Sequence, residues 1–368
     1  MYWWNVNKMR LVVVGIVAAI VLGGESSKAD FTFSVPMLLD EPFNSTGVKC
    51  FNCISSDGLE MYFERPVPID DILSLNRDLY VSTRATTNDP WSVPVNMGPV
   101  VNSNYIDSDV SLSSDGLELY FCSNRGGEGL REIWVTTRDS KGAKWNTPVN
   151  LGPPINTSGS NMTPWITPDG LELYFSSTRP GGYGNIDIWF SKRASTNDPW
   201  QTPVNLGPVV NSDIDDCFPC LSSDGLVLFF CDSDNPSYLF RPGGHGQTDM
   251  WMTKRKSLAD PWESPVNLGP GMNTSYFESN PRISPDGSVL YFTSSRLGTI
   301  SGFSAIWEAH ILPTVDFNGD GIVDATDTGI MIDCWGTDEP LCDIGPMPWG
   351  DGIVDVEDLK ILVGYLFE

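Results

Sequence analysis

The sequence predicts a mainly β protein: a five-bladed β-propeller closed by an N-terminal strand, followed by a small α-helical domain with calcium loops. Three observations predict this organisation. A motif containing Asp-Gly returns five times, the segment before the first copy matches the end of the other repeats, and an acidic loop follows the last copy. A regular recurrence at this spacing is typical of stacked supersecondary units.

Each repeat contains an Asp-Gly pair between two short apolar segments, as in SSDGLELYF at 113–121. Glycine tolerates the positive φ of a tight turn, so the motif predicts a β-hairpin. A glycine-rich connection, a third strand and a closing segment such as WQTPVNLGP at 200–208 follow. Four short strands with proline only in the last predict a propeller blade, because an outer edge strand tolerates proline.

The fifth repeat lacks its closing segment, because the acidic loop follows its third strand, SAIWEAHIL at 304–312. The missing piece is found at the other end of the chain. SVPMLLDEPFNS at 34–45 aligns without gaps with SVPVNMGPVVNS at 92–103. We therefore expect the N-terminal segment to supply the outer strand of the fifth blade and to close the ring.

Residues 34–312 resemble the TolB-type, WD-repeat-like propeller family, whose repeats carry Pro-x-x-Ser-Pro-Asp-Gly before a Leu-Tyr-Phe strand. The pattern is fullest in PRISPDGSVLYF at 281–292 and PWITPDGLELYF at 164–175. The resemblance implies the propeller fold for residues 30–312. It implies no particular activity, because propellers serve both binding proteins and enzymes.

Residues 1–29 are typical of a signal peptide, since Lys8 and Arg10 precede an apolar run at 11–22 and small residues precede Asp30. The run is shorter than the about 20 residues that span a bilayer. We expect a mature chain without a membrane span that is secreted, periplasmic or at the cell surface; a retained anchor is the alternative. The formal net charge of −25 repels phosphate backbones, so we expect no nucleic-acid partner.

A ring of variable residues is expected at one mouth of the propeller channel, eight positions before each Asp-Gly pair. Binding sites are typically found where a repeated scaffold varies. A tryptophan on an inner strand offers a face for stacking on a sugar. The predicted ligand-binding residues are Lys49, Asp107, Asn161, Trp165, Asp216 and Glu278. A solvated or turn-capping polar ring is the alternative.

Three functions remain open for the propeller. The first is non-catalytic binding of a glycan or protein. The second is a glycoside hydrolase or another polysaccharide-degrading enzyme, with Asp107, Asp216 and Glu278 as acid and base or nucleophile. A carboxylate pair across the channel would favour hydrolysis, whereas acids paired with arginines would disfavour it. The third is a structural protein of the cell envelope.

An arginine follows the second strand of every repeat, and an acid precedes the third-strand aromatic in four of them. We expect these arginines and acids to form a structural ion pair within each blade. The arginines are Arg65, Arg125, Arg179, Arg241 and Arg296, and the acids are Asp78, Glu132, Asp187 and Asp249.

Eight cysteines in an exported chain predict disulfides. We expect Cys334 and Cys342 to bridge the C-terminal domain, and Cys217 and Cys231 flank one hairpin closely enough to pair. The two C-x-x-C pairs that begin at Cys50 and Cys217 leave a zinc site as a less favoured alternative.

The stretch DFNGDGIVDATD at 316–327 has the register of an EF-type calcium loop, with oxygen ligands at alternating positions. The predicted ligands are Asp316, Asn318, Asp320, the carbonyl of Ile322, Asp324 and Asp327. A degenerate second loop offers Asp351, the carbonyl of Ile353, Asp355 and Asp358. Its positions 1 and 3 are Met347 and Trp349, so that water, backbone or Asp343 would have to complete it.

Asp at position 12 and the lack of a helix before the first loop make residues 313–368 similar to a type I dockerin, which contains two loop–helix halves. The resemblance implies calcium binding and attachment to a cohesin-type partner. Positions 10 and 11 differ between the halves, being Ala325-Thr326 in one and Val356-Glu357 in the other. A fold-stabilising or sorting module is the alternative for this domain.

Overall fold

The computed structural model describes most of the propeller and parts of the C-terminal domain. The described ranges are 31–39, 42–44, 50–67, 76–127, 129–232, 241–296, 304–313, 315–318, 323–337, 342–345 and 353–366. The predicted signal peptide lies outside the described residues. By contacts the chain divides into two compact units, one of Phe33–Leu312 and one that contains the C-terminal residues from Pro313 onward.

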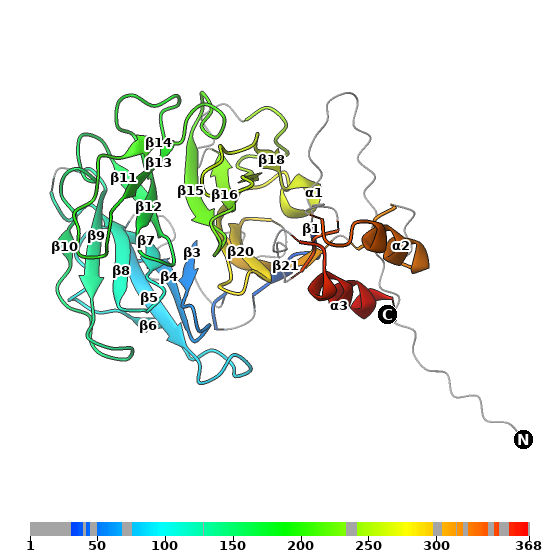
Figure 1. Cartoon of the computed structure of the whole chain (residues 1–368). Coiled ribbons are helices and arrows are strands. Elements are labelled where there is room, and N and C mark those ends of the chain that lie inside the picture. The colour runs from blue at the N-terminus through cyan, green and yellow to red at the C-terminus, as the bar shows by residue number, and fades with distance from the viewer. Residues whose placement is uncertain are drawn as a thin grey trace, which may run out of the picture. The chain divides into compact units, whose positions relative to one another are not determined.

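The first unit is a five-bladed β-propeller, as predicted (Figure 1). Blade 1 contains β3 (Cys50–Ile54), β4 (Glu60–Pro66), β5 (Arg77–Thr83) and β6 (Val95–Asn96). Blade 2 contains β7 (Asp107–Leu112), β8 (Glu118–Ser123), β9 (Glu132–Thr137) and β10 (Val149–Asn150). Blade 3 contains β11 (Asn161–Ile166), β12 (Glu172–Ser177), β13 (Asp187–Lys192) and β14 (Val204–Asn205). Blade 4 contains β15 (Asp216–Leu221), β16 (Val227–Asp232), β17 (Met250–Lys254) and β18 (Val266–Asn267).

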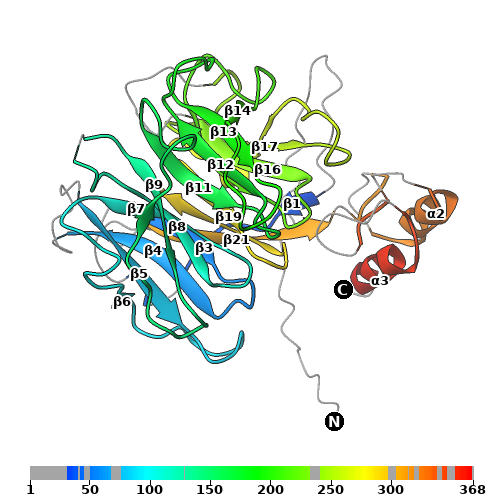
Figure 2. The ribbon, with the colours of Figure 1, turned by 60° about the vertical axis from the view of Figure 1, so that its left-hand side comes forward.

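The fifth blade combines both ends of the propeller sequence. It contains β19 (Glu278–Ile283), β20 (Val289–Ser294) and β21 (Ala305–Pro313), preceded by the short helix α1 (Gly269–Met272). The N-terminal strands β1 (Phe31–Phe33) and β2 (Met37–Leu38) both pair with β21. The innermost strands contact one another around the ring, and β3 packs against β19 and β20 (Figure 2). The predicted closure by an N-terminal strand is therefore confirmed.

Each hairpin turn is held by the side chains of its own motif. In blade 2, Gly116 has φ +74°, a conformation that glycine adopts without strain. The Asp115 carboxylate accepts hydrogen bonds from the hydroxyl of Ser113 (2.6 Å) and the N–H of Leu117 (2.9 Å). The Ser113 hydroxyl also accepts the N–H of Glu118 (2.9 Å). The repeated Ser-x-Asp-Gly sequence thus satisfies the polar groups of the turn that it forms.

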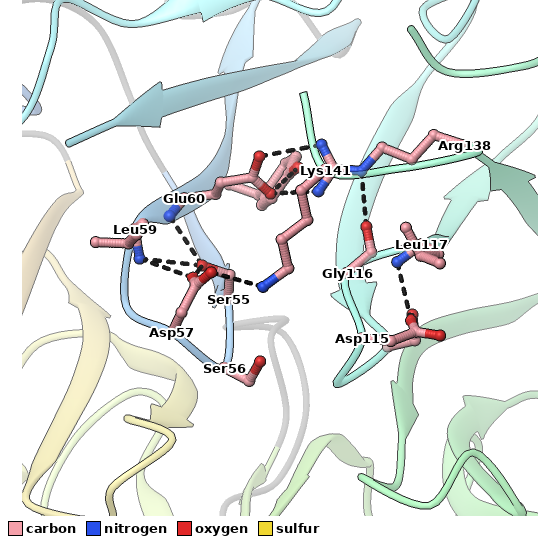
Figure 3. A network of polar contacts seen from close by, with 12 residues as sticks. Ser55, Ser56, Asp57, Leu59, Glu60, Asp115, Gly116, Leu117, Arg138 and Lys141 are labelled. Atoms are coloured by element: carbon pink, nitrogen blue, oxygen red, sulfur yellow. Dashed lines mark hydrogen bonds and ion pairs between the residues drawn. The ribbon is translucent and has the colours of Figure 1, made fainter. Parts of the chain in front are cut away.

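An arginine after the third strand joins blade 2 to blade 1 and blade 3 to blade 2, as Figure 3 shows for blades 1 and 2. The guanidinium of Arg138 donates to both oxygens of Glu60 on β4, at 3.0 and 2.6 Å, and to the carbonyl of Gly116 at 2.7 Å. Its other face stacks on Trp145, with 4.4 Å between Cζ and the ring centre. The glutamate is replaced by Val227 in blade 4 and by Val289 in blade 5.

Apolar clusters fill the space between adjacent blades. Tyr62 and Leu79 of blade 1 pack with Leu119 and Phe121 of blade 2, and equivalent clusters follow between the next blades. The third-strand tryptophans, such as Trp134, contribute to these clusters. The core therefore lies between the sheets rather than at the channel, which leaves the channel-facing residues more freedom to vary.

The second unit contains helices α2 (Ala325–Asp333) and α3 (Val356–Tyr365). Its core contains Phe317, Met331, Ile344, Val354 and Leu362. No helix in the described ranges is long and apolar enough to cross a bilayer.

Cys334, one of the two cysteines expected to bridge the C-terminal domain, is a free thiol in the structure, so this predicted disulfide is not formed. Cys342 is buried in the core of the second unit and Cys334 packs against it, where both act as small apolar side chains. Cys217 and Cys231 face each other across β15 and β16 with 3.8 Å between their sulfur atoms.

Candidate functional site

The acids of the predicted channel ring are buried and paired with arginines, and do not face the channel mouth as free carboxylates. Asp107, Asp216 and Glu278 begin the inner strands of three blades, but their side chains are fully buried. Each pairs with the arginine of its own blade: Asp107 with Arg125, Asp216 with Arg241 at 3.4 Å and Glu278 with Arg296 at 3.5 Å. Asn161 takes the same place in blade 3 and accepts from Arg179 at 2.7 Å. Lys49 lies outside the described residues.

These arginines do not pair with the third-strand acids, which corrects the expected ion pairs. Each third-strand acid instead accepts a hydrogen bond from the asparagine of the closing Pro-Val-Asn segment, for example Asp78 from Asn96 at 2.7 Å and Glu132 from Asn150 at 2.8 Å. The guanidinium of Arg179 also donates to the carbonyl of Ile155, which lies in the segment that leads to the inner strand β11. Buried acids that are paired in this way have the environment of a scaffold element, not of a catalytic carboxylate pair.

Trp165 does not join the ring, because it lies near the end of β11 whereas the ring residues begin their strands. It lines a cavity of about 210 Å³ with Cys53 and Ser111. The buried guanidinium of Arg282 lies over the Trp165 ring at 5.5 Å. Arg282 donates to the carbonyls of Asn52 (2.7 Å) and Pro219 (2.9 Å), and so links blade 5 to blades 1 and 4 across the channel.

A second cavity, of about 190 Å³, opens at the other end of the inner strands. It is lined by four charged side chains from blades 1 and 2: Glu64 on β4, Arg77 on β5, Asp109 on β7 and Arg131 just before β9. Its remaining lining includes Cys50, Ser108, Phe218, Phe277, Ser279 and Asn280. A concave pocket with convergent charged groups is the default candidate for a ligand site. We refer to it as the Glu64 pocket.

Glu64 is the centre of this pocket. Its carboxylate accepts the N–H of Asp109 at 3.1 Å, and the Arg77 Nε lies 3.8 Å away. Burial, and then the negative charge of Asp109, raise the pKa of Glu64 to about 7, although Arg77 and Arg131 oppose the change. The carboxyl group therefore gains and loses a proton near neutral pH, a property found at functional sites.

The four charges occur where the blades depart from their own repeat. The position of Glu64 is filled in the other blades by Cys122, Ser176, Cys231 and Thr293. The position of Arg77 and Arg131 is filled by Ile186, Thr248 and Ser304. The signal in the sequence is the variation at these two positions, which lie away from the strand entrances where the binding residues were expected.

Unusual backbone conformations also gather at this end of the channel. Asp109, Thr163, Phe218 and Asn280 occupy equivalent positions in four blades and have φ between 49° and 57°. Each lies where the register between the first two strands shifts. A branched or bulky side chain seldom adopts this conformation. Strain of this kind tends to cluster at functional sites.

Two aspartates of the first predicted calcium loop make hydrogen bonds at the start of α2. Asp324 caps the helix, and Asp327 accepts the N–H groups of Asp324 (2.9 Å), Phe317 (2.8 Å) and Asn318 (3.3 Å). Asp316 is described too, whereas Asp320 and Ile322 lie outside the described residues. The carboxylate at loop position 12 thus ties the helix start to loop positions 2 and 3.

The second half repeats this arrangement with a different register. Asp355 caps α3, and Asp358 accepts the N–H groups of Asp355, Ile344 and Gly345, at 2.6, 2.6 and 2.7 Å. Ile344 and Gly345 take the places that Phe317 and Asn318 have in the first half, so Asp343 corresponds to Asp316 in the chain.

The side chains that remain fit calcium in kind, because the acids offer carboxylate oxygen atoms and Asn318 offers its amide oxygen. Within the part of the chain that the structure describes, no three His, Cys, Asp or Glu side chains are grouped as a metal site. Of the second set, Asp351 lies outside the described residues, and Ile353 is exposed.

No family model and no curated protein matches this chain. Among solved structures, it is similar to TolB from Acinetobacter baumannii (13% identity, 73% of this chain and 54% of that chain, TM-score 0.40). It is also similar to a family 117 glycoside hydrolase from Zobellia galactanivorans (12%, 78% and 91%, TM-score 0.49). An α-L-arabinofuranosidase from Lactobacillus brevis is a third example (14%, 74% and 90%, TM-score 0.44). At such identities the likeness concerns the fold alone.

Proposed function

We propose that this chain is an exported, non-catalytic binding protein whose propeller holds a ligand in the Glu64 pocket. The observation that carries the proposal is the set of four charges that blades 1 and 2 alone place at one end of the channel. A repeated scaffold that departs from its pattern in one concave place has the organisation of a binding site. A purely structural envelope protein would have no need of such a pocket.

The test uses substitutions that the fold already tolerates in another blade. Arg131→Ile copies Ile186 of blade 3, and Glu64→Thr copies Thr293 of blade 5. The mature chain is screened on a glycan array in calcium and then titrated with the glycans it retains. We expect both variants to keep the melting temperature within a few degrees and to lose binding at least tenfold. Binding that survives both substitutions would contradict the assignment of this pocket.

Glycoside hydrolysis stays a second candidate because of one observation: Glu64 and Asp109 line the same pocket, and the negative charge of Asp109 helps to raise the pKa of Glu64. Such hydrolysis needs two neighbouring carboxyl groups, one of which has a raised pKa and acts as the acid. In this reading Glu64 and Asp109 replace the Asp107, Asp216 and Glu278 expected from the sequence. If the wild type releases reducing ends from the glycans that it retains, and Glu64→Gln does not, the propeller is a glycoside hydrolase and not a binding protein.

For the C-terminal domain we propose calcium binding and attachment to a cohesin-type partner. The support is that both halves begin their helices with an aspartate cap and direct a buried aspartate back onto the loop. Asp316, Asn318, Asp324 and Asp327 would contribute to the first site, and Asp343, Asp355 and Asp358 to the second. Pull-down of the full mature chain with immobilised cohesins, in calcium and in chelator, tests the attachment.

A further inference from the structure

We propose that the Glu64 pocket selects a sugar residue that carries a carboxylate, a uronic acid, and that it binds this residue together with a proton. The inference rests on the proposed binding function and names its ligand class. It is carried by the charges of the pocket, the unpartnered hydroxyl of Ser279 and the size of the cavity.

The charge balance of the pocket is opposite to that of the protein. Arg77 and Arg131 contribute two positive charges against the carboxyl groups of Glu64 and Asp109. With Glu64 protonated the pocket carries a net charge of +1, although the whole chain has a formal net charge of −25. Guanidinium groups bind carboxylates in preference to neutral groups, especially where water is partly excluded. An anionic group is therefore favoured at this place on an otherwise repulsive surface.

The protonation state of the Glu64 carboxyl group decides whether the pocket accepts an anion. Protonated, its carboxyl group donates a hydrogen bond to an incoming carboxylate, whereas the ionised form repels it. The charged groups that act on Glu64 are Arg77 on β5, Asp109 on β7 and Arg131 before β9, and the thiol of Cys50 on β3 faces it as well. Because burial raises the pKa of Glu64 to about 7, ligand binding should be strongest below pH 7 and weaken as the pH rises.

Hydroxyl recognition points to a sugar. Ser279 lines the cavity and is 1% exposed, yet its hydroxyl has no hydrogen-bond partner among the described residues. A buried hydroxyl without a partner costs free energy that a ligand hydroxyl would recover. Ser108 and Asn280 add polar groups, and Phe218 and Phe277 add apolar surface. At about 190 Å³ the cavity is smaller than the about 300 Å³ at which drug-sized pockets begin, so one sugar ring suits it.

The experiment compares sugars that differ only at one carbon. Glucuronate and galacturonate, with glucose and galactose as neutral counterparts, are titrated calorimetrically into the full mature chain at pH 6 and pH 8. We expect the uronates to bind at least tenfold more tightly than the neutral sugars at pH 6. Their affinity should fall about tenfold at pH 8, since one group with a pKa near 7 must stay protonated. Titration in two buffers of different ionisation enthalpy should show proton uptake at pH 8.

Two variants separate the roles of the residues. Arg131→Ile should reduce uronate affinity at least tenfold at both pH values. Glu64→Gln keeps a donor at the same place, so it should still bind uronates but lose the dependence on pH. Equal affinity for glucuronate and glucose, or an unchanged pH dependence in Glu64→Gln, would overturn the inference.

The outcome also distinguishes this inference from the proposed function. Neutral glycans that bind and are lost in Arg131→Ile would leave the binding function intact and refute the uronate class. A complete lack of glycan binding in the array and in the titrations would refute both.

Discussion

The side chain of Asn44 clamps the backbone of Ile306, a residue 262 positions later in the chain. Its amide nitrogen donates to the Ile306 carbonyl at 3.0 Å, and its oxygen accepts the Ile306 N–H at 3.1 Å. The same clamp joins residues 23 apart in the other blades, as between Asn211 and Ile188. Blade 5 therefore uses the ordinary clamp of a blade to fasten the two ends of the propeller.

We predict that Asn44→Ala loosens the closure of the ring. The substitution leaves the buried N–H of Ile306 without the Asn44 acceptor, at a cost of about 1–3 kcal/mol, whereas the Ile306 carbonyl keeps the N–H of Leu39 as a donor. Urea unfolding should show this loss, and limited proteolysis should cut the N-terminal segment faster. Asn211→Ala is the control, because it removes the same bonds within one continuous blade. Protease resistance equal to that of the control would contradict the role of Asn44 in closure.

A second prediction concerns the junction of blades 1 and 2 in Figure 3. Arg138→Ala breaks the bidentate pair with Glu60 and the stacking on Trp145, and the Arg138 side chain is only 3% exposed. We expect a loss of about 2–4 kcal/mol in the free energy of unfolding.

Lys141 provides the matched control at the same junction. It pairs with Asp57 at 2.6 Å, but its side chain is 42% exposed. An exposed pair contributes about 0–1 kcal/mol, so Lys141→Ala should change stability little. If both variants lose the same amount, burial of the arginine is not what holds the blades together.

A third prediction concerns pH. Burial raises the pKa of Asp216 to about 7, although Arg241 and Ser212 oppose it. The folded chain then holds a proton that the unfolded chain releases near pH 4. Asp216 should therefore lower the stability of the folded state progressively as the pH rises from about 4 to 7, by about 1.4 kcal/mol for each pKa unit between the two states.

Asp216→Asn tests this prediction. The fold tolerates asparagine at this position, because Asn161 occupies the equivalent place in blade 3. The variant should fold normally and be at least as stable as the wild type at pH 8. Its stability, measured by urea unfolding at several pH values, should also depend less on pH between 5 and 8. A variant much less stable at pH 8 would show that the ionised pair with Arg241 is stabilising.

The fold could be predicted because its signals are local and repeated. The hairpin is encoded in the Ser-x-Asp-Gly motif itself, and the alignment of 34–45 with 92–103 was enough to predict the closure. The clamp of Asn44 on Ile306 was not identified, since an aligned asparagine does not reveal which backbone groups it contacts.

The site was harder to predict for a related reason. Glu132 is nearer to Arg125 in the sequence than Asp107 is, yet the arginine pairs with Asp107, because the path of its side chain decides between the two acids. Glu64 and Asp109 are 45 residues apart and meet between two blades. Their proximity depends on the rotation from one blade to the next, which no local pattern encodes.

The last prediction concerns calcium in the C-terminal domain. If Asp343 is the first ligand of the second loop, Asp343→Ala should weaken one of two binding events at least tenfold in calorimetry of the full mature chain. Asp333→Ala is the control, because Asp333 is exposed at the end of α2 and belongs to neither loop. Chelator should lower the melting temperature of the wild-type domain, since ion binding to the folded state adds to its stability. If Asp343→Ala still shows two unchanged binding events, the second loop begins at Met347 and not at Asp343. If the domain melts at the same temperature in chelator, calcium does not stabilise it.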